Sequence, residues 1–315
     1  MKVSLIGAGN IGGTLAYLIA SKKLASEIEL IDVNGDLARG KALDVSQALP
    51  LIGYTMKING SANMERIKGS SVIIITAGIP RKPGMTREEL VDVNAVVMKE
   101  VGEKIKKLAP KAFVIVVTNP LDVMVWVLYK AAEINPDRIV GMAGVLDSSR
   151  MNFFLAQELD VSVADVKSLV LGSHGDSMVP LFRHSTVSGM SLPELVSAGF
   201  LTKDKVDSII ERTRSGGAEI VALLKTGSAY YTPAASALEM AEAYLLDQKK
   251  TLVCSVTMKG RYGVEDDVFS GIPVIIGSSG VERVIELDLD PDERRMFENS
   301  LAATRKLVVE AQKYF

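Results

Sequence analysis

Short apolar runs of strand length alternate with amphipathic helical stretches through the first half of the chain. Residues 71–76 and 113–118 are apolar almost throughout, as expected for strands that are covered on both faces. Strands that alternate with helices predict a parallel sheet with helices on both faces. The first 143 residues are therefore expected to form a doubly wound α/β domain. Its predicted strands cover residues 2–6, 27–32, 55–59, 71–76, 113–118 and 138–142.

The pattern changes after residue 143. Helical stretches predominate up to Leu246 and three strand-like runs follow. A helix that begins at Pro291, with Asp290 as its expected cap, closes the chain. We therefore expect residues 144–315 to form an α+β domain that packs tightly on the first. Within it, Gly216 and Gly217 fall in the middle of a long helical stretch, where they predict a kink or bulge.

The first predicted strand runs into a glycine-rich turn, G-x-G-x-x-G, and a helical pattern follows the turn. In this context Gly7 permits the tight turn, Gly9 allows a pyrophosphate to approach the backbone, and Gly12 lets helix and strand pack closely. Asn10 and Ile11 lie at the start of the helix, whose free N–H groups and positive dipole end favour a phosphate. The turn therefore predicts a dinucleotide site.

The second strand ends in Asp32, twenty positions after Gly12. A carboxylate at this place accepts hydrogen bonds from the adenosine ribose hydroxyls and repels a 2′-phosphate, which favours NAD over NADP. A solvated acid at a strand end is the alternative. The ordered strand–turn–helix–strand frame favours the cofactor.

Composition narrows the class of protein. The chain has 315 residues, 48% of them hydrophobic and 23% charged, which fits a globular enzyme rather than a disordered chain. A net charge of −2 provides no basic surface for nucleic acid. The single cysteine, Cys254, excludes an internal disulfide and a multi-cysteine metal site, and its apolar run favours a buried thiol. The chain opens directly on a strand and has no apolar run of membrane-spanning length, so we expect a cytoplasmic protein without a membrane partner.

Two histidines could transfer protons. His184 lies in an ordinary polar segment and is interpreted as structural or surface. His174 follows an apolar strand and is flanked by small residues, yet composition alone favours a packed or surface side chain for it too. A candidate partner is Asp147, where a helix is expected to start and which shares a face of that helix with Arg150. These two could form a plain salt bridge; alternatively Asp147 orients the histidine and Arg150 grips a substrate carboxylate.

Six segments follow one another along the chain: the glycine turn, Asp32 and residues 81–87, 117–120, 147–150 and 172–176. In this order they resemble the lactate/malate dehydrogenase superfamily, and within it the malate dehydrogenases of lactate dehydrogenase-like type. The resemblance covers essentially the whole chain. It implies a Rossmann domain that binds NAD, reversible oxidation of (S)-malate to oxaloacetate, and assembly into a homotetramer or homodimer.

The resemblance also implies a role for each site residue. His174 takes the hydroxyl proton as hydride leaves the same carbon for the nicotinamide, and Asp147 orients it. Arg150 binds the carboxylate next to the reacting carbon. Arg87 polarises the carbonyl in the reverse direction. Asn119 hydrogen-bonds the substrate and helps to place the nicotinamide.

Two further residues, Asn94 and Val117, match cofactor contacts of the family. The peptide bond between Asn119 and Pro120 is cis in relatives, although sequence alone favours trans.

Substrate choice depends on Arg81 in this interpretation. Residues 79–87 resemble the family's mobile flap, in which malate dehydrogenases carry an arginine that pairs with the distal carboxylate. A solvated loop cation is the alternative role for Arg81. Ala229 matches a pocket wall that is threonine in many lactate enzymes, so it leaves room for a four-carbon diacid.

Three other functions remain open on the sequence. A lactate dehydrogenase, or a 2-hydroxy acid dehydrogenase of broad specificity, is the nearest. An NAD-dependent glycosidase would need a metal held by cysteine and histidine, and Cys254 is far along the chain from His174. A catalytically silent NAD-binding protein would not need the full set of candidate site residues.

Overall fold

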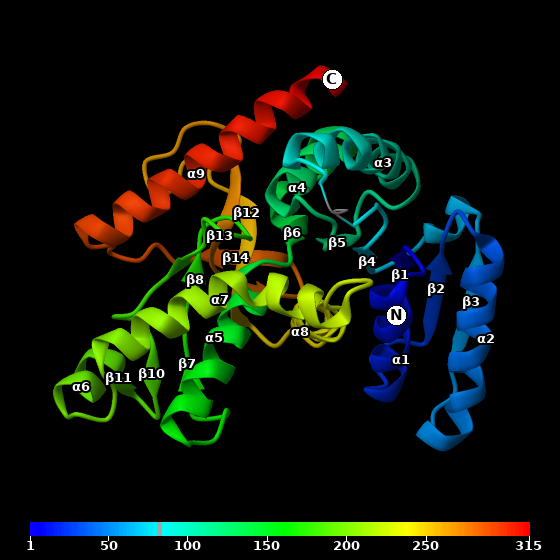
Figure 1. Ribbon diagram of the computed structural model, residues 1–315. Coiled ribbons are helices and arrows are strands. Elements are labelled where there is room, and N and C mark those ends of the chain that lie inside the picture. The colour runs from blue at the N-terminus through cyan, green and yellow to red at the C-terminus, as the bar shows by residue number, and fades with distance from the viewer. Residues whose placement is uncertain (81–83) are drawn as a thin grey trace.

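The computed structural model describes residues 1–80 and 84–315 (Figure 1). Arg81, the predicted specificity residue, therefore lies outside the described residues. The first half consists of β1 (Lys2–Ile6), α1 (Asn10–Ser21), β2 (Glu27–Ile31), α2 (Gly35–Ile52), β3 (Lys57–Ser61), the 3₁₀ helix η1 (Met64–Ile67), β4 (Val72–Ile75), α3 (Arg87–Leu108), β5 (Phe113–Val116), α4 (Leu121–Ala132), η2 (Pro136–Arg138) and β6 (Ile139–Gly141).

The second half mixes helices with short and long strands. It consists of α5 (Gly144–Leu159), β7 (Val166–Lys167), β8 (Val170–Leu171), β9 (Val179–Pro180), β10 (Thr186–Val187), β11 (Met190–Ser191), α6 (Leu192–Ser197), α7 (Lys203–Leu224), α8 (Tyr231–Leu245), β12 (Lys250–Thr257), β13 (Phe269–Gly277), β14 (Gly280–Val284), α9 (Pro291–Ala311) and η3 (Gln312–Tyr314).

Six parallel strands form the first part of the main sheet, in the order β3-β2-β1-β4-β5-β6. This order confirms the predicted doubly wound architecture. Strands are added on one side of β1 up to β3 and on its other side from β4 onward, and this switch between β1 and β4 opens a crevice at the strands' carboxyl ends. Alternate residues of each strand face opposite sides. Phe113 and Ile115 pack into the core beside α1 and α8, whereas Val114 and Val116 pack against α3 and α4.

The sheet does not stop at the predicted domain boundary. β12 pairs antiparallel with β6 where Ser255 faces Gly141, and β13 and β14 continue the same sheet. Helix α8, from the second half, also covers the parallel strands of the first half. The α+β character predicted for the second half is confirmed, and the two halves share one sheet, which the sequence pattern did not indicate.

One helix starts earlier than expected. α5 begins at Gly144 rather than at Asp147, so Asp147 lies inside its first turn. α7 is a single helix through Gly216 and Gly217, and the kink or bulge expected there stays a prediction. Gly216 packs against a side chain of the site described below.

The expected buried thiol and the expected cap of the last helix are both confirmed. Cys254 is fully buried, and burial raises the pKa of its thiol. The carboxylate of Asp290 caps α9 by accepting the backbone N–H groups of Asp292 and Glu293. Among the described residues, no helix combines the length and apolar character needed to cross a bilayer.

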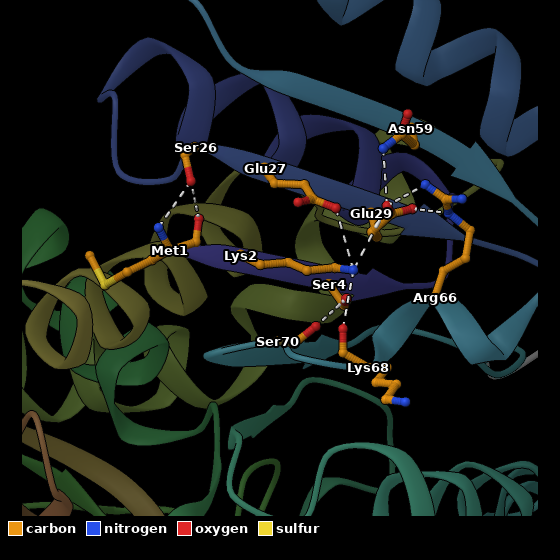
Figure 2. Close-up of polar contacts among 10 residues, drawn as sticks. All are labelled: Met1, Lys2, Ser4, Ser26, Glu27, Glu29, Asn59, Arg66, Lys68 and Ser70. Atoms are coloured by element: carbon orange, nitrogen blue, oxygen red, sulfur yellow. Dashed lines mark hydrogen bonds and ion pairs between the residues drawn. The ribbon is translucent and has the colours of Figure 1, made fainter.

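A buried acid stabilises the outer strands of the sheet. Glu29 of β2 is 0% exposed and accepts two hydrogen bonds of 2.6 Å from Arg66 and one of 3.0 Å from Asn59 (Figure 2). Burial opposes its ionisation, but the hydrogen bonds and charge of Arg66 outweigh that effect and lower the pKa of Glu29. Lys2 lies 3.9 Å from the same carboxylate. The cluster joins β1, β2, β3 and η1.

Removing Arg66 should therefore destabilise the fold. Arg66→Ala leaves a buried carboxylate with only partial compensation, so we expect a loss of about 3 kcal/mol in the free energy of unfolding at pH 7, measured by urea titration. Because folding lowers the pKa of Glu29, the stabilisation that Arg66 gives is lost as the pH falls through the pKa of Glu29 in the folded protein. The difference between variant and parent should then shrink in acid.

A matched control is Arg39→Ala, which removes an arginine from an exposed pair with Asp36 and should cost less than about 1 kcal/mol. Equal stability of the two variants at pH 7 would contradict the role of the buried cluster.

Candidate active site

The crevice at the carboxyl ends of the parallel strands contains a cavity of about 690 Å³. Both halves of the chain line it. Its walls include Ile11, Arg87, Asn119, Arg150, His174 and Ala229. The structure thus brings together, around one cavity, residues that the sequence singled out from segments more than two hundred positions apart.

The glycine turn has the geometry expected for a dinucleotide site. Gly7 has a φ of 111°, which side-chain-bearing residues rarely adopt. A Cβ atom at Gly12 would lie 1.9 Å from the carbonyl oxygen of Gly7, so helix and strand could not pack as they do. A Cβ at Gly9 would meet nothing within 4 Å, which leaves open space where a pyrophosphate would approach. The three glycines therefore fit the three roles predicted for them.

Asp32 braces the same turn. Its carboxylate accepts the N–H of Ala8 at 2.7 Å and the N–H of Asn34 at 2.9 Å. The Nζ of Lys41 donates to the carbonyl of Gly9 at 2.7 Å and adds a cation beside the turn. Since a carboxylate has about four acceptor sites, Asp32 retains capacity for ribose hydroxyls.

His174 and Asp147 are in contact. The Nδ1 of His174 lies 2.9 Å from Oδ2 of Asp147, whose side chain is 2% exposed. Burial disfavours the charged imidazole, but the charge and hydrogen bond of Asp147 outweigh burial and raise the pKa of His174. A carboxylate can only accept, so Nδ1 carries the proton and Nε2 is the basic nitrogen of the neutral ring. The pair is arranged to accept one proton and to stabilise the resulting cation.

Arg150 lies one helical turn from Asp147, with 3.7 Å between its Nη1 and Oδ1 of the acid. Burial lowers the pKa of Arg150 and the charge of Asp147 opposes that effect; the guanidinium nevertheless stays charged. The glycine pair of α7 packs against it: a Cβ at Gly216 would lie 3.1 Å from Cδ of Arg150, and one at Gly217 would lie 3.6 Å from Nη2. The contact at Gly216 is tight and the one at Gly217 is an ordinary one, so Gly216 is the residue that gives this arginine its space.

Arg87 is the first residue of α3, after a capping box between Thr86 and Glu89. Its Nη2 lies 2.5 Å from Oδ2 of Asp176, which belongs to the loop of His174. Arg87 therefore reaches the cavity wall next to the histidine, as the proposed polarising role requires.

Asn119 precedes a cis peptide bond to Pro120, which confirms that expectation. Asn94 is 0% exposed; its side-chain amide accepts from the N–H of Ile79 at 2.9 Å and donates to the carbonyl of Asn119 at 2.7 Å. Val117 is 5% exposed and lines the cavity. Asn94 thus supports the backbone behind the cavity, and its predicted contact with NAD stays a prediction.

Two polar residues that the sequence pattern did not reveal belong to this region: Asp122 lines the cavity, and Ser255 contacts Asp122. Asp122 of α4 and Ser255 of β12 are buried and hydrogen-bonded to each other at 2.6 Å. An acid placed two residues after Asn119-Pro120, in the apolar first turns of a helix, was the signal available for Asp122.

Two family models match the chain. One describes the lactate/malate dehydrogenase NAD-binding domain and matches residues 1–141, and the other describes the alpha/beta C-terminal domain and matches residues 144–314. A curated malate dehydrogenase from Neorickettsia sennetsu is 93% identical over 315 residues, which is 100% of both chains.

Solved structures of both activities resemble the chain. A malate dehydrogenase from Cryptosporidium parvum has a TM-score of 0.96 and 44% identity, with 99% of each chain covered. A lactate dehydrogenase from the same organism, complexed with lactic acid and NAD, has a TM-score of 0.95 and 41% identity, with 99% of this chain and 98% of that one covered.

Filling the space beside Arg150 tests the arrangement of α7. Gly216→Val places methyl groups against the arginine side chain, so the affinity for a small dicarboxylate such as oxalate, measured by calorimetry with NADH present, should fall about tenfold. The matched control is Ser215→Val, which introduces the same residue at an exposed position of the same helix. Unchanged affinity in a folded Gly216→Val protein would show that the glycine does not make room for Arg150.

Proposed function

The chain belongs to the lactate/malate dehydrogenase family, and on that premise we propose that it oxidises (S)-malate to oxaloacetate reversibly with NAD. The observation that carries the choice of malate is the 93% identity to a malate dehydrogenase over the whole chain. The fold itself does not discriminate, because a malate and a lactate dehydrogenase superpose on it about equally well.

The residues of the cavity support proton transfer coupled to hydride transfer. NAD supplies the hydride acceptor when bound. Nε2 of His174 accepts the hydroxyl proton of malate, and Asp147 stabilises the imidazolium that forms. In the reverse direction the same imidazolium returns the proton, while Arg87 stabilises negative charge that builds on the carbonyl oxygen. Asn119 is positioned on the cavity wall to hydrogen-bond the same oxygen.

Two arginines account for the diacid. Arg150 presents a guanidinium fork to the carboxylate next to the reacting carbon. Arg81, whose place rests on the family resemblance, pairs with the distal carboxylate. Beside lactate's methyl group that arginine would lack a partner, and an unpaired buried charge is costly. Ala229 on the cavity wall leaves room for the longer substrate.

The proposal extends to three features of the whole protein. The chain divides into two domains, an NAD-binding domain of residues 1–143 and a substrate domain of residues 144–315. The enzyme assembles into a homotetramer or homodimer and works in the cytoplasm. Light scattering after gel filtration distinguishes the two assemblies from a monomer.

A paired assay tests the substrate. With NADH, kcat/KM for oxaloacetate should exceed that for pyruvate by ~10³-fold or more, because the distal carboxylate meets a cation. Arg81→Gln should lower activity on oxaloacetate and reduce this ratio, whereas the neighbouring Lys82→Gln should leave the ratio unchanged. A preference for pyruvate in the parent enzyme would refute malate as the substrate.

A further inference from the structure

Asp122 is a buried acid that the proposed reaction does not use. It lies in the first turn of α4, directly after the cis peptide bond of Asn119, and is 4% exposed. No lysine or arginine among the described residues forms an ion pair with it. Burying an ionised carboxylate without a cationic partner costs free energy, so the presence of an acid at this position requires an explanation.

Its two oxygens connect two elements of the site. Oδ2 accepts the backbone N–H of His174 at 3.0 Å, and Oδ1 accepts the hydroxyl of Ser255 at 2.6 Å. Ser255 is 0% exposed and pairs with β6 through Gly141, so it gives the acid a rigid support. Asp122 therefore holds the backbone of the histidine in place from the side of α4, while Asp147 holds the ring from the side of α5.

Hydrogen bonding alone does not require an acid here. An asparagine could accept the N–H of His174 with its oxygen and donate its amide to the oxygen of Ser255. What the carboxylate adds is negative charge close to the imidazole. Of the ionisable groups around His174, Asp147 and Arg150 come from α5 and Asp122 from α4. Arg87 of α3, paired with Asp176 of the histidine loop, lies on the cavity wall beside them. The charges of Asp147 and Asp122 favour the imidazolium, and that of Arg150 opposes it.

We propose that Asp122 is a positioning residue for His174, which fixes its backbone and supplies a second negative charge that favours the protonated imidazole. This inference rests on the proposed role of His174 as the proton acceptor. The ring of His174 is then placed between two acids: one on Nδ1, which sets the tautomer, and one behind the main chain, which adds proton affinity.

The ionisation of Asp122 itself fits this role. Burial raises the pKa of Asp122 to about 6, and the hydrogen bonds from Ser255 and His174 oppose that rise. Because the imidazolium also favours the ionised acid, the two groups titrate as a coupled pair. The second charge is present at neutral pH and is lost in mild acid.

The substitution Asp122→Asn tests charge separately from hydrogen bonding. In a His184→Gln background His174 is the sole histidine, so its ring can be titrated by NMR in the protein without cofactor. We expect the pKa of His174 to fall by about one unit relative to the same protein with Asp122. The acid limb of kcat/KM for malate oxidation should move to lower pH by the same amount, with NADH affinity unchanged.

The control is Asp267→Asn, which also removes one negative charge. Asp267 pairs with Lys130 of α4, the helix that carries Asp122, and its replacement should leave the pKa of His174 unchanged. If the Asp122→Asn protein folds and the pKa of His174 is unchanged, the proposal is overturned, even if kcat is lower. If that variant does not fold, Ser255→Ala provides the second test. It removes a donor from the acid, disfavours its ionisation and should shift His174 in the same direction by less; no shift would again overturn the proposal.

Failure of the malate assignment gives a different result. A parent enzyme that is inactive on malate would remove the proposed function, whereas the NMR titration would still report whether Asp122 supports the charge on His174.

Discussion

The hydrogen bond between His174 and Asp147 is the interaction on which the rest of the site depends. It joins two segments that lie 27 positions apart and sets both the tautomer and the proton affinity of the ring. Its geometry is fixed by backbone packing. A Cβ at Gly144, the first residue of α5, would lie 2.3 Å from Cγ1 of Val253 and 2.5 Å from the carbonyl of Val170. Only a glycine lets α5 start against β12 and β8, and that start places Asp147 in the cavity.

The shared sheet explains how residues from both halves keep their relative positions. β6 and β12 pair across the division of the chain, and Gly172, two residues before the histidine, exchanges two 2.9 Å backbone hydrogen bonds with Gly271 of β13. The loop of His174 is thus fastened to the same sheet whose other strands carry the glycine turn and Asn119. A site assembled on one rigid layer loses little order when its ligands bind.

The sequence was most informative where spacing has a mechanical meaning. The glycine turn, Asp32 and the apolar strands follow from local rules, and the architecture of the first half was predicted from them. The pairing of His174 with Asp147 needed the family resemblance, because sequence periodicity says nothing about contacts between a helix and a distant loop. Gly216 illustrates the limit: its pattern indicated a kink or bulge, whereas its close contact with Arg150, which is distant in the chain, could not be predicted from the pattern. Asp122 was hidden for the same reason, since its partners are far away in the chain.

The tautomer of His174 tests the central claim most directly. In ¹⁵N-labelled protein with His184 replaced by Gln, long-range ¹H–¹⁵N spectra at a pH where the ring is neutral distinguish a proton on Nδ1 from one on Nε2. Because a buried carboxylate accepts from Nδ1, the account predicts that the neutral ring carries its proton on Nδ1. In Asp147→Asn this tautomer should no longer predominate. A neutral ring with its proton on Nε2 in the parent protein would contradict the account, because the nitrogen proposed to accept the substrate's proton would already carry one.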